Sequence, residues 1–99
     1  MSDIRKLTTR TLTDGREQSF DGRTAWALAA LVAAGEKGCT PIDHPGPRWS
    51  AYVYKLRRVG LFVETLEEKH AGPYPGRHAR YVLRSAVEVV SVLEGRKAA

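Results

Sequence analysis

The stretch RWSAYVYKLRRVGLFVET, residues 48–65, decides the fold of this chain. Its first part predicts a helix over residues 47–59. Four residues at i, i+4, i+7 spacing should form the stripe of this helix that faces a core: Trp49, Val53, Leu56 and Gly60. Gly60 ends the helix, and the following LFVETL, residues 61–66, alternates between two faces as a strand does. The sequence therefore predicts a helix that passes directly into a strand.

The charge of this predicted helix lies away from its apolar stripe. Between Pro45 and Val63 the chain has four basic residues and no acidic one. The side opposite the stripe, with its flanks, comprises Arg48, Ser50, Ala51, Tyr54, Lys55 and Arg58. Arg57 lies closer to the stripe, where it is placed to pair with Glu64, so it ranks below Arg58. Cations gathered on one side of a helix are typical of an element that docks on duplex nucleic acid, and a merely solvated face is the plainer alternative.

Composition limits the classes of protein to which the chain can belong. Its 99 residues fit one domain, and its formal net charge is +5 with a pI near 9.7. Residues 22–84 hold ten basic and five acidic side chains, so the whole excess of 10 − 5 = +5 lies there and favours an anionic partner. The sequence has no apolar run long enough to span a bilayer and no secretory signal, so we expect a cytoplasmic protein. The single cysteine, Cys39, excludes an internal disulfide and is expected to be a small buried residue.

The segments before the basic helix predict a hairpin and two more helical pieces. Asp14-Gly15 is a strong hairpin signal between strands at 5–12 and 16–20. A helix over 23–34, capped by Asp21 or Thr24, has apolar residues on most sides and belongs at the centre of a core. The Gly- and Pro-rich segment after it leaves room only for a short, irregular turn of helix near residues 40–44.

The segments after the basic helix predict a second hairpin and a tail. A strand over 78–84 follows LFVETL after a Gly- and Pro-rich stretch that should project as a loop. Ser85-x-x-Glu88 is a capping-box pattern that predicts a short helix over 86–94. The four valines of this segment also favour a strand.

In this order of elements, and in the junction SAYVYKLRRVGLFVET, the chain resembles winged helix-turn-helix domains of small bacterial and phage proteins. The resemblance covers roughly residues 16–84. It implies an α+β fold with a three-helix core and a C-terminal β-hairpin wing, preceded here by an N-terminal β-hairpin and followed by a short C-terminal helix. A single domain would then fill residues 1–99, with the hairpin in 1–21, the winged-helix core in 22–84 and the tail in 85–99.

The resemblance also implies a way of binding double-stranded DNA, as in a small transcriptional regulator or an accessory protein of a mobile element. The third helix would enter the major groove, and the wing would touch the adjacent backbone or minor groove. The implied recognition residues are Arg48, Ser50, Ala51, Tyr54, Lys55, Arg57 and Arg58. The implied wing residues are Lys69, His70, Tyr74, Arg77 and His78. Because the helix has no Asn or Gln, phosphate contacts should outweigh base reading, and Glu67 and Glu68 would repel phosphate unless they turn away.

Other functions receive less support from the sequence. A winged helix that serves as a protein-interaction adaptor remains an alternative, because exposed tyrosines are frequent at interfaces and three were expected here: Tyr52, Tyr54 and Tyr74. The tail helix either covers the sheet or pairs with its copy in a homodimer. No nucleophile, base and orienting acid occur together, so we expect no enzyme. No metal-ligand spacing occurs either, so we expect no metal and no cofactor.

Overall fold

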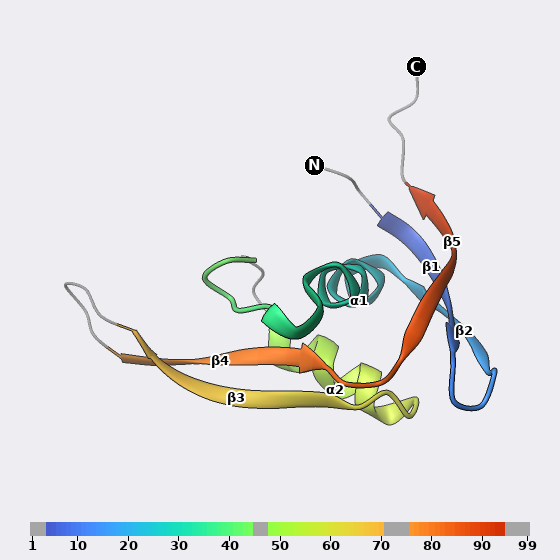
Figure 1. The fold of residues 1–99 in the computed structure, drawn as a ribbon. Helices are drawn as coiled ribbons and strands as arrows, with labels where there is room; N and C mark the ends of the chain where they lie inside the picture. The colour runs from blue at the N-terminus through green and yellow to red at the C-terminus, as the bar shows by residue number, and fades with distance from the viewer. Residues whose placement is uncertain (1–3, 45–47, 71–75, 95–99) are drawn as a thin grey trace, which may run out of the picture.

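The computed structural model describes residues 4–44, 48–70 and 76–94, and the fold is α+β (Figure 1). In chain order the elements are β1 Ile4–Thr11, β2 Glu17–Asp21, α1 Gly22–Ala34, the 3₁₀ turn η1 Gly35–Lys37, α2 Trp49–Arg58, β3 Val63–His70, β4 Gly76–Leu83 and β5 Val87–Glu94. Two antiparallel sheets form, one with the strand order β2-β1-β5 and one consisting of β3 and β4. Helix α1 contacts α2 and strands of both sheets, so it holds the two halves of the fold together.

The N-terminal hairpin confirms the prediction from Asp14-Gly15. Gly15 adopts a positive φ of 73°, which glycine reaches without steric cost. The turn is closed by the Thr11 amide, which donates to the Arg16 carbonyl at 2.9 Å. The register between β1 and β2 places Leu7 opposite Phe20, and both side chains are buried. One face of the hairpin therefore packs on the core.

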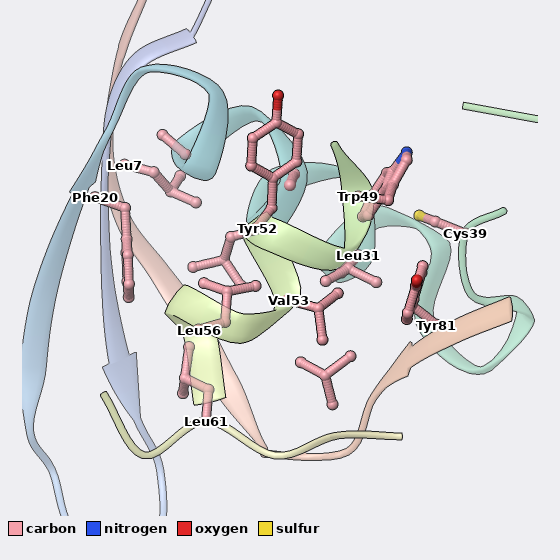
Figure 2. Packing of buried hydrophobic residues seen from close by; sticks show 14 residues of the cluster. Leu7, Phe20, Leu31, Cys39, Trp49, Tyr52, Val53, Leu56, Leu61 and Tyr81 are labelled. Atoms are coloured by element: carbon pink, nitrogen blue, oxygen red, sulfur yellow. The ribbon is translucent and has the colours of Figure 1, made fainter. Parts of the chain in front are cut away.

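Helix α1 occupies the centre of the core, as its apolar composition predicted. Leu28 and Leu31 are fully buried, and the alanines beside them allow neighbouring elements to approach closely. Figure 2 shows Leu31 with Leu7 of β1 and Val53 of α2 in one cluster of buried side chains. This cluster sets the position of α2 relative to the rest of the molecule.

Trp49 anchors the start of α2. Its ring stacks on Tyr81 at 5.8 Å between centroids and lies 5.5 Å from Trp26, while its indole nitrogen donates to the His44 carbonyl at 2.7 Å. The predicted core residues Trp49, Val53 and Leu56 are all buried, whereas Gly60 is exposed. The apolar stripe of the helix therefore ends at Leu56.

Tyr52 differs from the expectation that it would be exposed. It is only 8% exposed, and its ring lies edge-on to Trp49 at 6.4 Å. Residues three apart on a helix are neighbours, so Tyr52 lies on the flank of the core stripe and packs beside Trp49. Of the three tyrosines within the described residues, Tyr52, Tyr54 and Tyr81, only Tyr54 is exposed.

The predicted three-helix core is wrong, because the described residues contain two α-helices and one 3₁₀ turn. Gly38, with φ 72°, turns the chain so that Cys39 pairs with Tyr81 of β4 through two backbone hydrogen bonds of 2.8 Å. This pairing holds Cys39 extended. Residues 40–44 then form a single turn, in which Thr40 accepts hydrogen bonds from the amides of Asp43 and His44. One turn is too short to continue as a helix, since helix nucleation is costly.

The predicted tail helix is also wrong, because residues 87–94 form strand β5. Ser85 does not cap a helix: its hydroxyl accepts a hydrogen bond from the Phe62 amide at 2.8 Å. Glu88 accepts instead from Arg10 of β1 at 2.7 Å. The β-branched valines of this segment favour a strand where a pairing partner is available, and β1 provides that partner along its length.

The wing is a longer hairpin than the sequence predicted. Strands β3 and β4 pair from Val63 with Leu83 as far as His70 with Gly76. Residues 67–70, expected in a projecting loop, therefore belong to β3. Residues 71–75 lie outside the described part of the chain.

Candidate nucleic-acid interface

The outer face of α2 carries most of the residues that the sequence selected. Ser50, Lys55 and Arg58 are exposed, and Tyr54 is 58% exposed. Arg58 donates to the Tyr54 hydroxyl at 3.2 Å, and its guanidinium carbon lies 5.7 Å from the centroid of the Tyr54 ring. This contact pairs a flat apolar ring with a cation on the open side of the helix.

An open groove of about 390 Å³ lies between the first turn of α1 and the outer face of α2. We call it the basic groove, and its lining residues are Asp21, Arg23, Thr24, Arg48, Ala51, Tyr52 and Lys55. Three of these are cations and one is an acid, so the groove has a formal charge of 3 − 1 = +2. Arg48, Ala51 and Lys55 were predicted from the helix face, and the fold brings them together.

Arg23 is a member of the basic groove that the sequence analysis did not select. Its guanidinium lies 4.5 Å from the centroid of the Trp26 ring, and its Nε donates to the Tyr52 hydroxyl at 3.4 Å. The first turn of α1 contains no acidic residue, and Asp21 makes no capping hydrogen bond through its side chain. The available signal was a basic residue in a first helical turn that contains no acidic residue, since a helix amino terminus favours anions.

Arg57 has a different position from its neighbours on α2. It donates from Nε and Nη2 to the Val63 carbonyl at 3.1 and 2.6 Å and from Nη2 to the Thr65 hydroxyl at 2.8 Å. The expected pairing with Glu64 is wrong, because Glu64 accepts from Arg84 at 2.7 Å. Arg57 therefore ties the end of α2 to β3 and points away from the basic groove.

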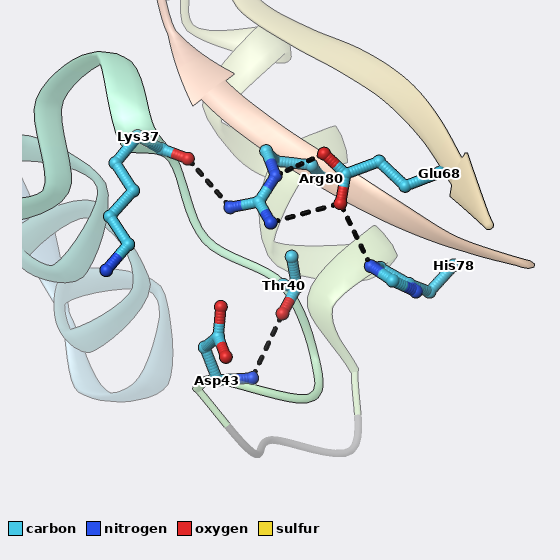
Figure 3. Close-up of polar contacts among 6 residues, drawn as sticks. All are labelled: Lys37, Thr40, Asp43, Glu68, His78 and Arg80. Atoms are coloured by element: carbon cyan, nitrogen blue, oxygen red, sulfur yellow. Dashed lines mark hydrogen bonds and ion pairs between the residues drawn. The ribbon is translucent and has the colours of Figure 1, made fainter. Parts of the chain in front are cut away.

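The outer half of the wing hairpin is fastened by a cluster around Glu68 (Figure 3). Arg80 donates to both oxygens of the Glu68 carboxylate at 2.5 and 3.0 Å, and its Nη1 also donates to the Lys37 carbonyl of η1 at 2.8 Å. His78 Nε2 lies 3.1 Å from the same carboxylate. The hydrogen bonds from Arg80 lower the pKa of the Glu68 carboxyl below its usual value. Glu68 is thus turned towards two basic side chains, as a wing that approaches phosphate requires.

The predicted wing residues are only partly described. Lys69 is exposed on β3, and the register places it opposite Arg77 of β4. His78 has a side chain that is 15% exposed and faces Glu68, so it belongs to the cluster around Glu68. Tyr74 and the side chains of His70 and Arg77 lie outside the described residues.

Ion pairs elsewhere in the molecule compensate several of its other cations. Arg10 bridges Glu17 and Glu88 at 2.6 and 2.7 Å across the three-stranded sheet. By contrast, five exposed or groove-lining cations on α1, α2 and β3 form no salt bridge with any described carboxylate: Arg23, Arg48, Lys55, Arg58 and Lys69. Arg5, Lys6 and Lys37 likewise form no salt bridge with a described carboxylate, and Arg57 forms hydrogen bonds to β3 instead. Uncompensated positive charge is therefore found on β1 and η1 as well as around α2 and on the wing.

Neither a reactive thiol nor a metal-binding group of side chains is found among the described residues. Cys39 is fully buried, and burial raises the pKa of its thiol to about 11, so it stays protonated at neutral pH. Within residues 4–44, 48–70 and 76–94, no group of three His, Cys, Asp or Glu side chains is placed to hold a metal ion. In the same residues, no helix is long and apolar enough to cross a membrane.

One comparison with known proteins found a match. A family model described as a winged helix domain matches residues 17–93, from the start of β2 almost to the end of β5. The segment after residue 84, which the sequence analysis placed outside the core, is therefore largely part of the matched unit. Comparisons with curated proteins and with solved structures gave no match.

Proposed function

The chain belongs to the winged helix domain family, and on that basis we propose that it binds double-stranded DNA. In this proposal α2 enters the major groove and the wing lies on the adjacent backbone or minor groove. The observation that carries it is the basic groove, where Arg23, Arg48 and Lys55 from two helices surround a space open to solvent. A cluster of cations beside a helix that can enter the major groove fits the phosphate backbone of a duplex.

The basic groove receives a backbone phosphate in this arrangement. Arg23 is held by Trp26 and Tyr52, so little side-chain entropy is lost when it meets an anion. The start of α1 adds the partial positive charge of a helix amino terminus. Lys69 on the wing supplies a second contact to phosphate, away from α2.

Base reading falls to the exposed residues of α2 between the two phosphate contacts. Tyr54 is suited to the methyl group of thymine, and Arg58 beside it is placed to neutralise a further phosphate. Ser50 and Ala51 complete this face of the helix. Arg57 is engaged by β3, so we assign it to holding α2 in place and not to the DNA contact.

This function suits a non-enzymatic cytoplasmic protein, either a small transcriptional regulator or an accessory protein of a mobile element. The adaptor alternative has lost part of its basis. One of the three tyrosines on which it rested, Tyr52, is buried against Trp49, which leaves Tyr54 as the exposed tyrosine among the described residues. Duplex DNA is therefore the partner that we propose.

The test is fluorescence anisotropy with a labelled pool of random duplexes, using the double variant Arg48→Ala with Lys55→Ala. We expect the double variant to bind at least about tenfold more weakly than the wild type, since it lacks two phosphate contacts. Arg5→Ala is the control, because Arg5 is an exposed cation on β1 that does not line the basic groove. If the double variant and the wild type bind equally, or if neither binds duplex DNA, the proposal is wrong.

A further inference from the structure

Strand β5 is an apolar strand at the edge of its sheet. It ends the strand order β2-β1-β5, and among the described residues its only hydrogen-bonded neighbour is β1. Seven of its eight residues are exposed. Four of them are large and apolar: Val89, Val90, Val92 and Leu93, which are 41–59% exposed. A long, exposed apolar edge is a template for pairing with another strand.

A β-bulge decides which residues of β5 share a face. The register places Thr9 of β1 opposite Val89 and Thr8 opposite Ser91, so Val90 is the extra residue. Leu7, on the same face of β1 as Thr9, lies opposite Val92. Val89 and Val92 therefore both lie on the inner face of the sheet, although they are three positions apart. In a regular strand residues three apart would lie on opposite faces.

This bulge makes β5 complementary to itself. We propose that two copies of the chain associate by antiparallel pairing of their β5 strands, with Val89 opposite the partner's Val92 around a two-fold axis. In a symmetric antiparallel dimer, the two residues of each opposed pair must lie on the same face of the joined sheet. Val89 and Val92 meet this condition. Glu88 and Leu93 would be opposite each other on the outer face. The pairing uses all eight residues of the strand and joins the two sheets into one of six strands.

The apolar rows of the core continue across this interface. On the inner face, the buried Leu7 lies beside Val92, which would lie beside the partner's Val89. Helix α1 packs on β1 and β2, and the inner face of β5 is left with half-exposed valines that a second copy would cover. Burying such side chains favours association.

The sharing of faces favours this register over its neighbour. In the proposed pairing each Glu88, which is neutralised by Arg10 of its own chain, is opposite the partner's Leu93 on the outer face. A shift by one residue would place Glu88 opposite the partner's Glu94, which lies on the same face as Val92, so the opposed side chains would no longer share a face. These self-complementary faces argue for a second copy of this chain as the occupant of the edge.

A disulfide experiment tests the proposed register of the two β5 strands directly. In the variant Val89→Cys with Val92→Cys, the two new thiols would face each other across the dimer, where Cα atoms of paired residues are about 4.5–5.5 Å apart and suit a disulfide. We expect covalent dimers after mild oxidation of this variant. The matched controls are the single variants Val89→Cys and Val92→Cys, because the register leaves each new thiol without a second new thiol opposite it. Each single variant should remain largely uncrosslinked.

Sedimentation without DNA tests the association itself, independently of the proposed DNA binding. We expect a wild-type dimer whose dissociation constant rises at least about tenfold in Val92→Lys. Phe62→Lys is the control, because Phe62 is 60% exposed and lies outside β5, and it should leave the dimer intact. A wild-type protein that stays monomeric overturns the proposal. Crosslinking of either single cysteine variant equal to that of the double variant, or a dimer that Val92→Lys does not weaken, overturns it as well.

Discussion

Removing the cations of the basic groove one by one should lower the salt dependence of DNA binding by a similar step for each cation. Three cations line the groove, and Arg58 and Lys69 lie outside it on α2 and the wing. These five side chains form no salt bridge with a described carboxylate. Each is therefore available to displace one counterion from the duplex when the complex forms.

The magnitude follows from the number of contacts. Each neutralised phosphate contributes about 0.9 to the slope of log affinity against log salt concentration, so five contacts give a slope of about −4.5. A fourfold rise in salt then weakens wild-type binding by about 500-fold. The triple variant Arg23→Ala, Arg48→Ala and Lys55→Ala keeps two contacts, so the same rise in salt should weaken its binding by only about 12-fold.

The assay is a series of anisotropy titrations of one duplex at several salt concentrations, for the wild type, Lys55→Ala and the triple variant. The single variant should lie between the others, with a slope reduced by about one. Arg5→Ala serves again as the control and should keep the wild-type slope. Parallel lines for the wild type and the triple variant would refute the assignment of the basic groove as the phosphate site, whatever the absolute affinities.

Three other changes separate the structural residues from the binding residues. Arg57→Ala should lower the free energy of unfolding by about 1.5 kcal/mol, because it removes hydrogen bonds between α2 and β3, yet keep the wild-type salt slope; chemical denaturation and anisotropy measure the two effects. The folded-state pKa of Glu68 is lowered, so its contribution to stability is complete above the unfolded pKa of about 4.3 and is lost as pH falls through the folded value. Melting temperatures of the wild type should therefore fall in this acid range more steeply than those of Glu68→Gln, and equal slopes would contradict the role of this carboxylate. Gly38→Ala should destabilise by more than about 3 kcal/mol, because φ is 72° and the new Cβ would lie 2.5 Å from the Tyr81 carbonyl oxygen. Gly15→Ala, with φ 73° and open space, should cost about 1 kcal/mol in the same denaturation experiment.

Local patterns predicted the elements whose causes are local. The Asp14-Gly15 turn depends on the backbone freedom of two adjacent residues, and the hairpin around it formed as expected. The stripe of Trp49, Val53 and Leu56 depends only on helical periodicity, and all three are buried. Burial of Tyr52 was missed because a residue on the flank of a stripe is buried or exposed according to its neighbours in space.

The tail was mispredicted because its structure depends on a distant partner. Ser85 and Glu88 fit a capping box, and the valines after them fit a strand. What decided between these patterns was β1, some eighty positions earlier, which offers backbone hydrogen bonds and the Arg10 guanidinium to Glu88. No window of sequence around the tail contains that information.

The basic groove shows the same limit for the candidate site. The sequence placed Arg48 and Lys55 on one face of a helix, but Arg23 joins them only because α1 packs beside α2. Net charge could not separate the cations by role either. Arg80 and Arg84 belong to the same basic segment of the chain, yet they are engaged by Glu68 and Glu64.

The positions of the acidic residues determine which cations form ion pairs and which remain unpaired. Glu68 of β3 pairs with Arg80 of β4, and Glu64 of β3 pairs with Arg84, just after β4. Arg80 also fixes the wing against η1 through the Lys37 carbonyl. Because Glu64 and Glu68 are paired with arginines at the wing, they do not neutralise the cations of α2. A domain with the same composition but with Glu64 and Glu68 moved onto α2 would keep its net charge and lose the uncompensated face. The placement of the acids, more than the number of basic residues, thus creates the surface that we propose for DNA.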